Sequence, residues 1–137
     1  MGGINIYCGS FSGDDKSGSA FEGVLAGMEA MASTHEGEAI ARVKSALEDA
    51  SDHILIEPDE ARLLLPLLRR YSAEVDGQLA VPGDLFDQMA RDEDESTIDA
   101  TVLQFGAGLG WRAYCARDLL KAFEVADAEA EPVALVW

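Results

Sequence analysis

Apolar residues near the start of the chain recur in two spacings, and each spacing predicts a different element. Residues 4–8, INIYC, combine β-branched and aromatic side chains and predict a strand. After a Gly/Ser-rich loop, Ser19 and Glu22 have the spacing of a capping box that opens a helix. Gly23 and Gly27 share one side of this helix, where we expect a neighbouring segment to approach closely. The apolar positions of the helix are Phe21, Val24, Leu25, Met28 and Met31.

The middle of the chain predicts a helix, a buried strand and another helix. Ser33 and Glu36 form a second capping box, and the helix that follows has an apolar face of Ile40, Val43, Leu47 and Ala50. Residues 53–57, HILIE, predict a buried strand, and Pro58 opens a helix with Leu64, Leu67, Leu68 and Tyr71 facing inward. Pro66 lies inside that helix. Because proline removes an amide donor and crowds the preceding turn, we expect a kink or a split there.

The periodicity is weaker in the third quarter of the chain. Asp76 and Gly77 indicate a turn, residues 78–81 an edge strand, and Asp84 the cap of a short helix. Residues 97–105, TIDATVLQF, fit either a strand or a helix, and their β-branched content favours the strand.

A long helix and a final strand close the chain. The helix runs from Trp111 to about residue 130, and residues 133–137, VALVW, predict the strand. The elements together predict a fold of the α+β class, with an irregular α/β arrangement as the alternative. In it, about four to five helices cover a small mixed sheet of about three to five strands. We expect residues 1–137 to form a single compact domain, because no internal repeat or interdomain linker interrupts the pattern.

Charge changes this picture more than any other property. The chain has 26 acidic and 10 basic residues, so its formal net charge is −16. Such a charge disfavours direct binding to nucleic acids or to anionic membranes and favours basic protein surfaces. An alternative remains open, because the few lysines and the many Ala, Asp, Glu and Val residues are also typical of high-salt organisms and high-GC genomes.

Cysteine usage and hydropathy exclude several other classes. Cys8 and Cys115 are far apart in the sequence, and we expect two buried thiols in a strand and a helix. They do not have the spacing of a zinc site, and we expect no cofactor. The longest aliphatic run, at residues 63–68, is far shorter than the ~20 residues of a membrane span. No signal-peptide pattern is found at the N-terminus, so we expect a cytoplasmic location.

The Gly/Ser-rich loop at residues 9–19 is the first candidate for chemistry. It has a lysine after glycines, as a phosphate-binding loop has, but Asp14 and Asp15 precede Lys16 and would repel phosphate oxygens. The simplest interpretation is a flexible connection from a strand to a helix. A small metabolite-binding domain or an enzyme that uses this loop is retained as an alternative.

The stretch IYCGSFSG, residues 6–13, also resembles the first strand and loop of the lysine-decarboxylase-like Rossmann family, which includes cytokinin-activating phosphoribohydrolases. That family has a P-G-G-x-G-T signature. The nearest match here is Pro82-Gly83-Asp84, which lacks the later glycines and the threonine. The resemblance is therefore confined to the loop, and no residue role is carried over.

Two acidic clusters are the second candidate. Residues 84–99 contain seven acids and one base, Arg91, and a second cluster consists of Glu124, Asp127, Glu129 and Glu131. Each is either a solvated surface or a footprint for a basic partner. Because charge steers association better than it holds a complex, an apolar anchor is also expected. The predicted partner-binding residues are Asp84, Asp87, Asp92, Glu93, Asp94, Glu95 and Asp99, with Trp111 as the anchor and Arg112 beside it. The alternative is that Trp111 belongs to the core.

These observations lead to one main hypothesis and two alternatives. The main hypothesis is a non-enzymatic acidic binding protein of the inhibitor, immunity or anti-defence type, which docks on a basic site of a partner protein. A nucleic-acid channel is such a site, and the chain would then act as a nucleic-acid mimic. The alternatives are the loop-based metabolite-binding domain or enzyme, and a housekeeping domain whose acidity reflects its host. The oligomeric state is left open.

Overall fold

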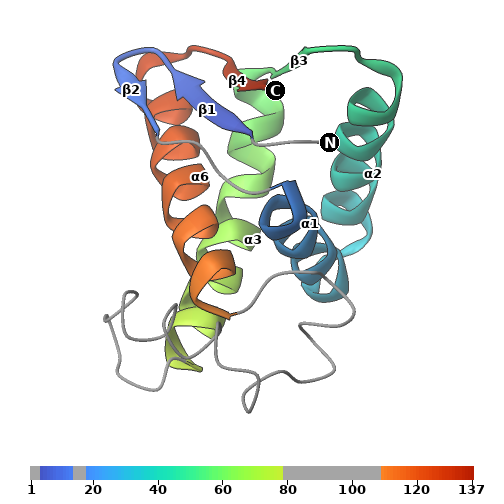
Figure 1. Cartoon of the computed structure of the whole chain (residues 1–137), viewed down its shortest axis with the longest axis vertical. Helices are drawn as coiled ribbons and strands as arrows, with labels where there is room; N and C mark the ends of the chain where they lie inside the picture. The colour runs from blue at the N-terminus through green and yellow to red at the C-terminus, as the bar shows by residue number, and fades with distance from the viewer. Residues whose placement is uncertain (1–3, 14–17, 79–108) are drawn as a thin grey trace.

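A computed structural model of the chain describes residues 4–13, 18–78 and 109–137. Within these residues, four helices and a four-stranded sheet confirm the α+β class. In Figure 1, the strands lie across one end of the molecule, and the long helices extend away from them.

The sheet places the last strand of the chain near its centre. Its strands are β1 (Asn5–Cys8), β2 (Phe11–Ser12), β3 (His53–Ile56) and β4 (Val133–Val136), in the order β2-β1-β4-β3. All three pairings are antiparallel, so the described sheet is antiparallel rather than mixed. The sequence predicted β1, β3 and β4. It did not predict β2, because a two-residue strand in a Gly/Ser-rich loop is defined by its pairing with β1 rather than by its own residues.

Burial alternates along the strands, so only one face of the sheet lies against the helices. In β1, Ile6 and Cys8 are buried while Tyr7 is exposed, and in β3 the exposed residues are His53 and Leu55. Side chains point to opposite faces at successive positions of a strand. The inner face therefore joins the hydrophobic core, whereas the outer face lies away from it.

The described residues form four helices, which are α1 (Gly18–Met31), α2 (Thr34–Asp49), α3 (Pro58–Gly77) and α6 (Leu109–Glu129). Of these, α6 and α2 contact the strands, and all four pack on one another. Figure 1 shows α3 and α6 side by side, and their contact is the most extensive between any two described elements. Helix α1 begins one residue before the predicted cap Ser19, and α3 extends through the predicted turn at Asp76 and Gly77.

The capping box at the start of α2 is confirmed. The Ser33 Oγ accepts a hydrogen bond from the Glu36 amide at 3.4 Å, and the Ser33 amide donates to Glu36 Oε1 at 3.0 Å. Arg70 of α3 donates to the same carboxylate oxygen at 2.9 Å. The Ser33 amide and the Arg70 guanidinium hold the pKa of Glu36 below its ordinary value, although burial opposes them.

The expectation of a split at Pro66 is wrong, because α3 is one continuous helix. Pro66 and Arg62, the residue one turn earlier, both lie on the exposed side. The carbonyl that loses its amide donor therefore faces water. On the opposite side, α3 buries Leu64, Leu67 and Leu68, and this packing favours an unbroken helix.

Close packing on the glycine side of α1 is confirmed at Gly27. A Cβ atom on Gly27 would lie 2.2 Å from Cε2 of the buried Tyr71 ring, so glycine allows α1 to approach α3. The Tyr71 hydroxyl lies near the buried Arg112 of α6. Burial raises the pKa of Tyr71, and the positive charge of Arg112 opposes this effect. Both cysteines are free and buried, as expected.

Candidate partner-binding surface

The first predicted acidic cluster lies outside the residues that the structure describes. It comprises Asp84, Asp87, Asp92, Glu93, Asp94, Glu95 and Asp99. Its role in partner binding remains a prediction from the sequence.

Trp111 and Arg112 lie in the first turns of α6 but in different environments. The Trp111 side chain is 38% exposed, so it is not enclosed in the core. Its role as an anchor remains a prediction from the sequence. Arg112 is buried, and its charge acts on the Tyr71 hydroxyl of α3. The structure thus places Arg112 in the packing between α3 and α6, while Trp111 borders the surface.

The second predicted acidic cluster divides into two parts. Glu124 and Asp127 face α3, where Arg69 lies 3.8 Å from Glu124 Oε1 and Arg62 lies 2.7 Å from Asp127 Oδ1. Glu129 is the last residue of α6, two residues after Asp127, and Glu131 follows the helix. Two of the four acids are therefore neutralised by arginines, and the other two lie beside the sheet.

Basic residues elsewhere in the helices also contact carboxylates. Arg42 pairs with Glu60 across α2 and α3 at 2.7 Å, and Lys44 pairs with Glu29 across α1 and α2 at 2.9 Å. The remaining described pairs of this kind include Arg70–Glu36 and Arg117–Asp76, both at 2.9 Å. We call α1, α2, α3 and α6 as far as Asp127 the helical body, and its basic residues offset part of its acidity.

The segments that build the sheet have a different composition. Residues 4–13, 50–57 and 128–137, which we call the sheet end, contain four acids and no lysine or arginine. The acids are Asp52, Glu57, Glu129 and Glu131, all of them exposed. No described lysine or arginine pairs with any of these four. Their nearest described polar contacts include His53 for Asp52, at 2.6 Å, and Ser10 for Glu129, at 2.7 Å.

The outer face of the sheet is free of formal charge apart from the titratable His53. The strand register places Tyr7 and Leu55 on either side of Ala134, with Ser12 next to Tyr7. The neighbouring row consists of Asn5, Val136 and His53. We call these seven residues the free face. Tyr7 is 40% exposed and Leu55 is 53% exposed, so two large apolar side chains meet solvent only two strands apart.

Sequence reasoning missed Tyr7 and Leu55 as candidates, although a signal was present. In INIYC and HILIE, the alternation that buries Ile6 and Ile54 turns the next residue outward. Leu55 and Tyr7 are the apolar residues at those outward positions. The period-2 pattern of each strand would have found them once the strands were known to be covered on one face only.

The described part of the Gly/Ser-rich loop is surrounded by carboxylates. Gly9 has a positive φ of 51°, and a Cβ there would lie 3.0 Å from Glu129 Oε1 and 3.4 Å from the Cγ of Glu131. A Cβ on Gly13 would lie 3.0 Å from Asp118 Oδ2. Burial, with the charges of Glu129 and Glu131, raises the pKa of the neighbouring Cys8 thiol. This arrangement opposes phosphate binding at residues 9–13.

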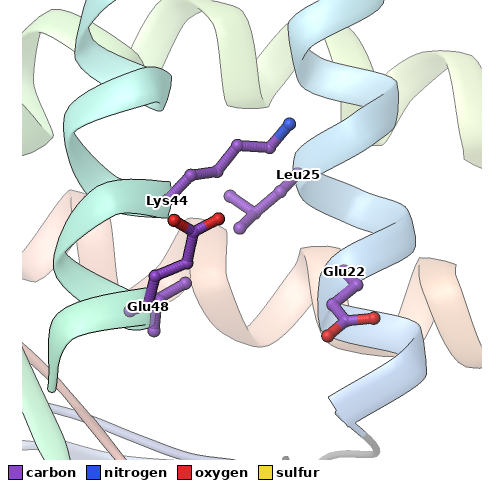
Figure 2. A pocket seen from close by; sticks show the side chains of 5 residues that line it. Glu22, Leu25, Lys44 and Glu48 are labelled. Atoms are coloured by element: carbon purple, nitrogen blue, oxygen red, sulfur yellow. The ribbon is translucent and has the colours of Figure 1, made fainter.

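A shallow groove of about 300 Å³ lies between α1 and α2. It is lined by Glu22, Leu25, Lys44, Leu47 and Glu48. In Figure 2, Lys44 extends from α2 toward α1, close to Leu25, with Glu22 and Glu48 on the two sides of the groove. Because Lys44 already pairs with Glu29, the groove offers no uncommitted positive charge to an anionic ligand.

In residues 4–13, 18–78 and 109–137, no group of three or more His, Cys, Asp or Glu residues is placed to hold a metal ion. Over the same part of the chain, no helix combines the length and apolar character that crossing a membrane requires.

Comparison with protein-family models, with curated proteins and with solved structures gives no match.

Proposed function

We propose that this chain is a non-enzymatic acidic binding protein of the inhibitor or immunity type, acting in the cytoplasm. It docks its negative surface on a basic site of a partner protein, such as a nucleic-acid-binding channel. The observation that carries the proposal is the uneven distribution of charge. The sheet end contains four exposed acids and no lysine or arginine, whereas the helical body pairs most of its basic residues with carboxylates.

An uneven distribution of charge favours the hypothesis of a basic partner over the hypothesis that the acidity reflects a host-wide bias in composition. A bias in composition alone would place basic residues among the acids over the whole surface, whereas the sheet end has acids without any lysine or arginine. The helical body also has exposed acids with no described basic partner, such as Glu22 and Glu48, but in a region that has basic residues as well. The net charge of −16 adds a long-range field that attracts basic surfaces and accelerates their association. The carboxylates around Gly9 and Gly13 give less support to an enzyme that uses the loop for phosphate ligands.

The test begins with a basic partner recovered from lysate of the source cells. Immobilised protein is loaded at low salt, and bound proteins are eluted with a NaCl gradient, identified and purified. Association rates are then measured by surface plasmon resonance from 50 mM to 500 mM NaCl. We expect a basic protein whose association slows steeply with salt, because exposed charges are screened within about 8–10 Å near physiological ionic strength.

Three charge variants locate the surface that steers association. One neutralises the sheet-end acids Asp52, Glu57, Glu129 and Glu131, and one neutralises Asp92, Glu93, Asp94 and Glu95. The matched control neutralises four acids that contact a basic residue, namely Glu29, Glu60, Asp76 and Glu124.

All three variants lose the same formal charge, so any difference between them reflects position. We expect at least one of the first two to slow association about tenfold at low salt, and the control to slow it much less. The proposal fails if no salt-labile basic protein is recovered, or if association does not depend on salt.

A further inference from the structure

We infer that the free face of the sheet is the apolar centre of the docking surface, and that its occupant is a basic protein surface with an apolar centre of its own. This inference rests on the proposed function and specifies where the partner binds. Tyr7 and Leu55 are the anchors, and the acids of the sheet end form the rim.

The composition of the free face fits the centre of an interface. Charged residues are depleted at interface centres, and aromatic residues are enriched there. In a chain with a net charge of −16, the free face has no Asp, Glu, Lys or Arg among its seven residues. The apolar side chains of Tyr7, Leu55, Ala134 and Val136 lie together on it.

The geometry makes the two anchors act as a pair. Tyr7 and Leu55 are both opposite Ala134, one on each neighbouring strand, so their side chains point the same way. Strands are about 4.8 Å apart, which places the two backbones about 10 Å from each other across a small residue. A side chain from a partner can therefore contact both anchors over Ala134.

The free face is too small to form a whole interface, so the rim of acids must also contact the partner. Three strands of four residues and one of two residues cover on the order of 200 Å². A specific interface buries about 800 Å² on each partner, so the contact extends beyond the strands. The residues at the strand ends include Asp52 and Glu57 of the β3 segment and Glu129 and Glu131 before β4.

Charge complementarity selects the occupant. A rim with four acids and no lysine or arginine fits a partner with basic residues around its apolar centre. A second copy of this chain would bring the same acids against one another across a two-fold interface, and this repulsion opposes a homodimer.

The test compares exposed apolar residues on and off the free face. The probe is the purified basic protein from the salt-elution experiment. The test variant combines Tyr7→Ser and Leu55→Ser. The control is Leu63→Ser on α3, because this side chain is 39% exposed, close to the 40% of Tyr7. Trp111→Ser on α6, whose side chain is 38% exposed, tests the other anchor, which the sequence predicts. All four positions are partly exposed, and a denaturant-unfolding curve checks that each variant folds.

We expect the double variant to weaken binding at least tenfold, mainly by faster dissociation, with the salt dependence of association unchanged. Leu63→Ser should change the affinity less than twofold. Amide hydrogen exchange of the wild-type complex provides a second measurement that needs no variant, and we expect protection in β1, β3 and β4.

Four results would overturn the inference. Loss of binding only in Trp111→Ser, or protection only outside the sheet, would move the docking surface and leave the proposed function standing. A wild-type dimer that Leu55→Ser dissociates would assign the free face to a second copy. Absence of any salt-labile basic partner would remove the proposed function and this inference together.

Discussion

In the helical body, arginines and a lysine from α2, α3 and α6 contact carboxylates of neighbouring helices, whereas the sheet end has four acids and no lysine or arginine. The two regions also differ in how they use apolar residues. Tyr71 of the helical body is buried against Gly27, while Tyr7 of the sheet end is 40% exposed.

Under the proposed function, the contrast separates residues that hold the fold from residues that are available to a partner. Substitutions at the contacts inside the helical body should change the free energy of unfolding. Substitutions of exposed sheet-end residues should leave that free energy almost unchanged, because surface positions without special contacts contribute little.

The close contact between α1 and α3 should give the largest change in stability. In Gly27→Ala, the new Cβ would lie 2.2 Å from Cε2 and 2.9 Å from Cζ of Tyr71, whose ring is buried and cannot move freely. Overpacking of this kind costs about 1–3 kcal/mol, which exceeds the gain of about 1 kcal/mol from replacing a helical glycine. We expect the free energy of unfolding in urea to fall by about 1–2 kcal/mol.

Gly37→Ala is the matched control for this prediction. Gly37 lies in α2, and its Cβ would make ordinary contact with Ala32 at 3.9 Å. Here only the helix propensity changes, so we expect a gain of up to about 1 kcal/mol. If both variants gained stability, the approach of α1 to α3 would not depend on Gly27.

The same contact shows how far the sequence predicts this fold. The spacing of Gly23 and Gly27 predicted a close neighbour on that side of α1, but Tyr71 as the neighbour depends on tertiary packing. Capping signals placed the start of α2 correctly because Ser33 and Glu36 satisfy each other locally. The strand β2 was missed because it forms only against β1.

The candidate surface was less predictable than the fold. Net charge is a property of composition, so the sequence indicated a basic partner directly. The split of the second acidic cluster depends on the arginines of α3, which are more than fifty residues away in the sequence. The pairing of Tyr7 with Leu55 depends on β4 lying between β1 and β3, and no local pattern specifies that order.

The capping box of α2 should produce a smaller effect that depends on pH. The pKa of Glu36 is lowered in the folded state, chiefly by the hydrogen bond from the Ser33 amide and also by Arg70. Its contribution to stability is therefore complete above the ordinary glutamate pKa of about 4.3 and is lost as the pH falls through the lowered folded value. We expect Glu36→Gln to be about 0.5–1 kcal/mol less stable than wild type at pH 7, and this gap to close at low pH.

The control for this prediction is Glu38→Gln, on the exposed side of the same helix. It removes one negative charge without removing the contacts to Ser33 and Arg70. Urea unfolding is measured from pH 7 to pH 2.5 for wild type, Glu36→Gln and Glu38→Gln. The comparison of the two variants cancels the general change in self-repulsion that follows the loss of one negative charge. A gap between wild type and Glu36→Gln that stayed constant over this range would contradict the role given to the Glu36 carboxylate.

The smallest effects should differ in sign between the two regions. Arg117→Gln removes a basic partner from Asp76, at 2.9 Å, and should lower the free energy of unfolding by about 0.5 kcal/mol at low salt. Glu131→Gln removes an acid that lies near Glu129 and has no described basic partner, so stability should rise slightly, by less than about 0.5 kcal/mol. Both changes should shrink in 1 M NaCl, where the screening length is about 3 Å. Urea unfolding midpoints at low and high salt show whether each variant is more or less stable than wild type. If Glu131→Gln were destabilising at low salt, the acids of the sheet end would be serving the fold, and their availability to a partner would lose its main support.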